Sequence, residues 1–244
     1  TIMPLGSTKS VYNVLSAEPE YSEFLEMVLG GDPDSVAQNL MSNTLGTKYT
    51  CPNKDNNYNM TLFDNYNYTV YVPTNNSIRE LIDNGYLPTW EDFEKYYTIS
   101  VESNDADSIA YAKIAKYIIK QRITDFVRYH VQDNSVAING APNMDVQGNY
   151  LLSNEFETMK LNPENKRYFS LKVSQSGPKA GSSAFINIED VMGNKRSVVT
   201  TSSNLYNHFC RDMWLETSGN TRFIYTSSDA VVHQIDGALF FSAD

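Results

Sequence analysis

The chain has little cysteine, histidine, tryptophan and positive charge for its length. Its 244 residues include two cysteines, three histidines and two tryptophans, and 29 acidic residues outnumber 19 Lys and Arg to give a formal net charge of −10. No basic stripe interrupts this acidic balance, and phosphate binding requires clustered cations. We therefore expect neither nucleic acid nor an anionic membrane surface as a partner.

Long hydrophobic runs and a signal segment are also missing. A helix that spans a bilayer needs about 20 consecutive apolar residues, and no run in the sequence approaches that length. Residues 1–9 lack the charged start and apolar centre of a signal peptide. We interpret them as a lead-in, with an inter-domain linker as the alternative, and expect no membrane insertion by this chain. A lipid anchor outside the sequence stays open.

The scarce cysteines and histidines do not form a metal-binding pattern. Cys51 and Cys210 lie far apart, so a disulfide and two unpaired thiols are both open. His130, His208 and His233 each lack a second ligand at helical or strand spacing. The sequence therefore predicts no metal site and no cofactor.

The usual catalytic signatures are absent as well. The sequence has no G-x-S-x-G elbow, P-loop, dinucleotide-binding glycine pattern or H-E-x-x-H. A triad built from a histidine with distant Ser and Asp stays open, because such groups are assembled in space. Adjacent carboxylates such as Glu189 and Asp190 are badly placed to flank one glycosidic bond. We interpret the chain as a protein that is not an enzyme.

The sequence does contain a helical first half and a β-rich second half. Two short helices, broken near Pro19 and stopped at Gly30, are predicted from residue 10. The longest helical pattern runs from Ser108 to His130 and should bury positions 119, 123, 126, 127 and 130. Short strands follow at VAIN, NYLLS, TMKLN, YFSLKVSQ, AFINIED, SVVT, RFIYTSS and AVVHQIDGALFF, whereas SNLYNHFCRDMWL at 203–215 is predicted helical or irregular. This pattern predicts one α+β domain over residues 10–244.

The stretch TVYVPTNNSI at 69–78 predicts a sharp strand-to-helix corner. Its first four residues favour a strand, which Pro73 should end because proline lacks the N–H that a ladder needs. Thr74 or Asn75 then supplies a side-chain oxygen to cap a helix.

Three stretches together resemble the conserved boxes of the fasciclin-like domain family. They are TVYVPTNNSI at 69, DFVRYHV at 125 and AVVHQIDGALF at 230, in the family's order and with SVYNVLSAEPEYSEFLEMV in the place of its N-terminal helices. The resemblance covers residues 10 to 241 and implies a wedge of β-sheets flanked by helices. It also implies structural roles for the motif residues Pro73, Thr74, Asn75, Tyr129, His130 and His233. We expect His130 to be buried and hydrogen-bonded.

The resemblance further implies a function in adhesion or ligand binding. VVHQIDGALF, with NHFCRDMW upstream, is most similar to the large fasciclin domains of surface lipoproteins in Bacteroidetes-type bacteria. This implies an extracytoplasmic location, at the cell surface or in the periplasm with an outer-membrane anchor, and a protein or glycan ligand. The alternative is a carbohydrate-active enzyme or an accessory glycan-binding protein of a polysaccharide-uptake system.

The chain departs from the family by its length. Segments near 45–66, 86–108 and 193–222 are interpreted as insertions, and both cysteines are expected to lie in them, outside the common core. Since variable loops on a rigid scaffold often carry binding, we expect their aromatic residues to form any ligand surface, although these rings could equally pin the loops to the domain. The candidates are Tyr58, Tyr66, Trp90, Tyr96, Tyr97 and Trp214.

Overall fold

The computed structural model describes residues 9–30, 67–138, 154–176, 185–218 and 221–243. The helices are α1 (Val11–Ala17), the 3-10 helix η1 (Pro19–Tyr21), α2 (Ser22–Leu29), α3 (Asn75–Asp83), α4 (Trp90–Glu102), α5 (Ala106–Tyr129) and the 3-10 helix η3 (Ser203–Leu205). The strands are β1 (Asn67–Pro73), β2 (Val131–Asp133), β3 (Asn154–Asn162), β4 (Arg167–Ser176), β5 (Phe185–Glu189), β6 (Lys195–Ser197), β7 (His208–Ser218) and β8 (Thr221–Ile235). The predicted helical first half and β-rich second half are both present.

The strands form one mixed sheet of eight strands in the order β6-β5-β4-β3-β2-β1-β8-β7. The first and last of the three family-like stretches meet at its centre, where β1 runs parallel to β8 and Tyr71 lies opposite His233. The other strand pairs are antiparallel. Helices and a mixed sheet give the chain an α+β fold, as the sequence predicts.

Strand β1 is buried on both faces of the sheet. Val70 and Val72 belong to the larger apolar core, which also contains residues of α1, α2 and α5. Tyr71 points to the second core, where it joins Leu171 of β4 and Ile186 of β5. Strand side chains alternate between faces, so β1 contributes to both cores. This fixes the place where the chain turns at Pro73 into α3.

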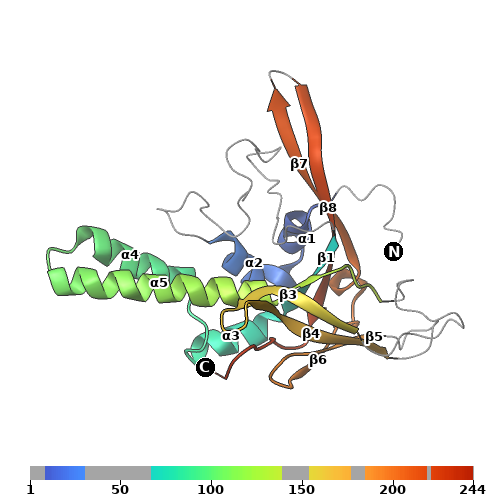
Figure 1. Ribbon diagram of the computed structural model, residues 1–244, viewed down its shortest axis with the longest axis horizontal. Helices are drawn as coiled ribbons and strands as arrows, with labels where there is room; N and C mark the ends of the chain where they lie inside the picture. The colour runs from blue at the N-terminus through green and yellow to red at the C-terminus, as the bar shows by residue number, and fades with distance from the viewer. Residues whose placement is uncertain (1–8, 31–66, 139–153, 177–184, 219–220, 244) are drawn as a thin grey trace, which may run out of the picture.

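Helix α5 is 24 residues long, and its second half packs against the larger core. The predicted buried face is confirmed, since Ile119, Ile123, Phe126, Val127 and His130 are all buried. Its first half pairs with α4, and Figure 1 shows the two helices projecting together beyond the sheet. The α4–α5 hairpin therefore projects away from the strands that the structure describes (Figure 1).

The segment predicted as helical or irregular at 203–215 was assigned wrongly over most of its length. Residues 203–205 form η3, but β7 begins at His208 and pairs with β8 through Ser218 opposite Thr221. The two stretches RFIYTSS and AVVHQI form one strand, β8, rather than two. Pairing with the strand that follows overrides the local preference here. Val136–Ile138, predicted as a strand, are buried but lie outside regular structure.

The expected place of Cys210 was also wrong. Cys210 lies on β7 and is fully buried in the larger core, not in a surface insertion. Its thiol donates a hydrogen bond to the carbonyl oxygen of His208 at 3.6 Å. Cys51 lies outside the described residues, so a disulfide and two unpaired thiols both stay open.

Candidate functional site

The predicted corner after β1 joins three elements. The Thr74 hydroxyl caps α3 by accepting the Ser77 N–H at 3.3 Å. The Asn75 side chain reaches to the start of α2, where its oxygen accepts the Glu23 N–H at 3.1 Å. Its amide donates to the carbonyl of Pro19 at 2.9 Å. Thr74 therefore caps its own helix, while Asn75 satisfies the exposed donor of another helix.

His130 ends α5 and is a fully buried, neutral side chain. Its Nε2 accepts the Leu239 N–H at 3.0 Å, so Nδ1 carries the proton and donates to the Phe126 carbonyl at 2.7 Å. Burial lowers the pKa of His130 from 6.5 to about 4. The expectation that His130 is buried and hydrogen-bonded is confirmed.

Tyr129 uses its ring and its hydroxyl to hold two parts of the sheet. The hydroxyl donates to the Ser170 carbonyl at 3.2 Å and accepts the Val191 N–H at 3.1 Å. Burial raises the pKa of the Tyr129 hydroxyl, which stays protonated at neutral pH. The ring packs edge-on against Phe241, with centroids 5.4 Å apart.

His233 on β8 occupies an equivalent position in the second core. Its Nδ1 accepts the Asn207 N–H at 3.0 Å, and Nε2 donates to the Val136 carbonyl at 2.6 Å. The ring stacks on Tyr71 with centroids 6.3 Å apart. Burial lowers the pKa of His233 to about 4, so this histidine is also neutral. Both ring nitrogens of each buried histidine are thus used by the backbone.

Side chains from other parts of the fold bind the backbone of the segment that follows β8. Arg196 Nε donates to the Ala238 carbonyl at 2.9 Å, and the Phe240 N–H donates to Asp190 Oδ2 at 2.8 Å. Between them, the Leu239 N–H is bound to His130. Residues 238–240 therefore have a fixed path across the end of α5.

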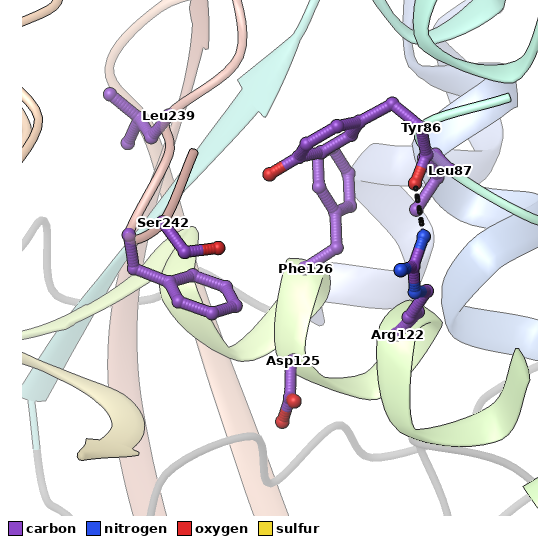
Figure 2. A pocket seen from close by; sticks show the side chains of 8 residues that line it. Tyr86, Leu87, Arg122, Asp125, Phe126, Leu239 and Ser242 are labelled. Carbon is purple, nitrogen blue, oxygen red and sulfur yellow. Dashed lines mark hydrogen bonds between the residues drawn. The ribbon is translucent and has the colours of Figure 1, made fainter. Parts of the chain in front are cut away.

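An open pocket of about 160 Å³ lies where this C-terminal segment meets α5 and the loop after α3. Figure 2 shows Tyr86 and Phe126 on one side of the pocket and Leu239 with Ser242 on the other. The lining residues are Tyr86, Leu87, Arg122, Asp125, Phe126, Leu239, Phe241 and Ser242. The pocket is smaller than the roughly 300 Å³ at the lower end of ordinary ligand sites, so it suits one ring-sized group.

Opposite charges stand at the edge of the pocket, one turn apart on α5. Arg122 Nη1 lies 3.4 Å from the Tyr86 carbonyl oxygen, a long hydrogen bond that Figure 2 marks. Asp125 Oδ1 lies 3.4 Å from Nζ of Lys160, which itself sits 5.3 Å from the centre of the Phe241 ring. The site thus combines flat aromatic walls with a guanidinium donor and a carboxylate acceptor.

Trp90, one of the predicted binding aromatics, is a partly buried contact between α2 and α4. Its indole N–H donates to the Met27 carbonyl at 2.8 Å, and its ring packs edge-on against Phe93 at 5.5 Å. The ring fills the space beside Gly30, where an added Cβ would lie 1.9 Å from the indole. Trp90 therefore has a structural role, and ligand binding by it stays a prediction.

The other predicted aromatics are spread over distant parts of the molecule. Tyr96 and Tyr97 on α4 are partly buried, and Tyr96 packs edge-on against Tyr111 of α5 at 5.9 Å. Trp214 belongs to β7, opposite Thr226. Tyr58 and Tyr66 lie outside the described residues. Trp90, Tyr96 and Tyr97 are not among the residues that line the pocket.

Most of the pocket was missed by sequence reasoning. Arg122 and Asp125 belong to a helix for which only the buried face was predicted, and Tyr86 was included only as the first residue of a predicted insertion. Phe126 alone among the lining residues was predicted to be buried on α5.

Comparisons with known proteins do not assign the chain to a family. No protein-family model matches it, and no curated protein matches it either. Among the described residues, no three His, Cys, Asp or Glu side chains are grouped as metal ligands. The described helices include none that is long and apolar enough to cross a membrane.

Proposed function

We propose that the chain is a non-enzymatic binding domain of the fasciclin-like type, exposed outside the cytoplasm on a surface lipoprotein, and that its ligand contact is the pocket between Tyr86 and Phe241. The pocket is the observation that carries the proposal. Its aromatic walls can pack against the flat, apolar side of a small ring. Arg122 and Asp125 at its edge can donate to and accept from the hydroxyl groups around such a ring. A sugar residue of a glycan has this chemistry.

The relation of the three family-like stretches supports the fasciclin-like part of the proposal. The first and last are adjacent parallel strands, and the Tyr71 N–H donates to the carbonyl of His130 at 2.9 Å. The His130 ring in turn binds Leu239 at the end of the last stretch. Segments that are distant in sequence thus depend on one another in the fold, as expected for motifs of one domain.

The state of the buried histidines supports binding over catalysis. Both ring nitrogens of His130 and of His233 are engaged by the backbone, and burial keeps both side chains neutral. A general base must reach the proton that it removes, and these rings have no such access. Glycoside cleavage usually requires two carboxylates, whereas Asp125 is the one carboxylate among the described lining residues.

A glycan array with the purified chain tests the proposal. We expect selective binding without turnover, and about tenfold weaker binding for Phe241→Leu, which removes the flat ring, and for Asp125→Asn, which removes the acceptor charge. Asp83→Asn, on the exposed end of α3, is the matched control. Binding that all three variants retain would place the ligand elsewhere, and release of shortened glycans would favour the carbohydrate-active alternative.

A further inference from the structure

Helix α5 carries a second apolar face on the side opposite its buried face. Tyr111, Ile114, Tyr117 and Ile118 are 65%, 63%, 63% and 47% exposed, although side chains of this kind are usually covered. Their spacing places them together along one side of the helix. We call these four residues the α5 stripe.

The α5 stripe lies on the projecting α4–α5 hairpin, clear of the sheet (Figure 1). Helix α4 covers the neighbouring side of α5, and Tyr111 marks the border through its edge-on contact with Tyr96. Val101, near the end of α4, is also 58% exposed. A contiguous apolar face on a projecting element is typical of an interaction surface.

The charges at the two ends of the stripe are complementary to those of a second, antiparallel α5 helix. From Ser108 to Gln121 the face that carries the stripe is uncharged, and Ala110 and Ala115 beside it allow close approach. Lys113 and Lys120 border the stripe beside Tyr117, four residues before it and three residues after it. Lys116 lies on the side of α5 that faces α4, where its Nζ is 5.1 Å from the centre of the Tyr97 ring. The two ends of the stripe have opposite charges, Asp107 at the start and Arg122 beyond the last turn, and both side chains are exposed.

We propose that the α5 stripe is the contact between two copies of this chain, whose α5 helices pair in antiparallel fashion about a two-fold axis near Ile114 and Ala115. That pairing places Asp107 of each copy opposite the partner's Arg122, at both ends of an apolar seam. The stripe is short compared with the roughly 800 Å² per partner of a standard stable interface. The dimer is therefore weak, with a dissociation constant on the order of 10 μM.

A lipid surface fits the same face less well. Asp107 stands at one end of the stripe, and the chain has a net charge of −10. An anionic bilayer would repel both. Sedimentation of the chain with phosphatidylcholine vesicles, with and without phosphatidylserine, measures this alternative directly.

Analytical ultracentrifugation of the full chain over a wide concentration range tests the dimer. We expect a reversible monomer–dimer equilibrium that Ile114→Glu weakens at least about tenfold, because the seam would then bury a carboxylate. Lys116→Gln, on the side of α5 that faces α4, should change the dissociation constant by less than about twofold. Circular dichroism establishes that each variant is folded, and Tyr117→Lys replaces Ile114→Glu if that variant is not.

Charge reversal tests the antiparallel arrangement. Asp107→Arg and Arg122→Asp should each weaken the dimer, and the double variant should restore it, because the pair then has its opposite charges exchanged. Arg122 also lines the pocket, so the readout is mass and not ligand binding. A wild-type chain that stays monomeric, a dimer that Ile114→Glu leaves intact, vesicle binding by the stripe, or a double variant that does not recover would each overturn the proposal.

Discussion

His130 shows how one side chain at the end of a helix can hold the end of the chain. Its ring bridges the Phe126 carbonyl and the Leu239 N–H, two groups far apart in sequence. Both are buried, so neither finds water when the ring is removed. The position therefore requires a neutral side chain with a donor on one side and an acceptor on the other.

Replacing His130 with alanine should lower the free energy of unfolding by about 1–3 kcal/mol, because the buried Leu239 N–H loses its acceptor. Urea denaturation measures the change. His208→Ala provides a control, since His208 is a partly exposed histidine at the start of β7. An equal loss for both variants, or none for His130→Ala, would contradict this account.

The two buried histidines also make stability depend on pH. Burial lowers the pKa of His130 and of His233 from 6.5 to about 4, so the unfolded chain takes up protons first as the pH falls. Their contribution is complete above pH 6.5 and is lost as the pH falls towards 4, at up to about 3 kcal/mol for each. Urea titrations across this window should show stability falling with acid. His130→Gln should flatten the slope, and an unchanged slope would show that His130 does not titrate as described.

At the scale of elements, short helices in this protein depend on side chains from elsewhere. The start of α2 is capped by Asn75 from the β1–α3 corner, and its end is covered by Trp90 from α4. Helix α2 has eight residues, and a helix of that length is marginal by itself. Its stability therefore belongs to the contacts between elements.

Asn75→Ala should lower the free energy of unfolding by about 1–2 kcal/mol, since the Glu23 N–H and the Pro19 carbonyl both lose their partner. Asn76→Ala, the exposed neighbour, should change it by less than about 0.5 kcal/mol. Thermal and urea unfolding of the two variants give the comparison. If the two behave alike, the corner does not cap α2.

Gly30→Ala should also destabilise the protein, by about 1–3 kcal/mol, because the new methyl group would lie 1.9 Å from the Trp90 ring. The backbone at Gly30 is extended, with φ at −69°, so the ring and not the backbone excludes a side chain. A double-mutant cycle with Trp90→Leu isolates the cause. The penalty of the methyl group should shrink in the Trp90→Leu background, and additive effects would argue against the contact.

At the scale of the whole molecule, the sequence predicted elements better than it predicted the site. Proline, capping side chains and helical spacing act locally, so the Pro73 corner and the buried face of α5 followed from neighbouring residues. Strand β7 did not follow, because its structure comes from pairing with β8. The pocket was missed for a different reason, since Tyr86, Arg122 and Phe241 come from three separate parts of the chain.

The central position of β1 also sets the order in which the protein can be completed. One neighbour of β1 is β2, but the other is β8, which ends at Ile235, so most of the chain must leave the ribosome before β1 has both partners. Until then one edge of an apolar strand is open to pairing with other chains. Pairing across so long an interval makes folding slow. Newly made chains should therefore depend on chaperones until β8 is synthesised, and a chain truncated before β8 should aggregate.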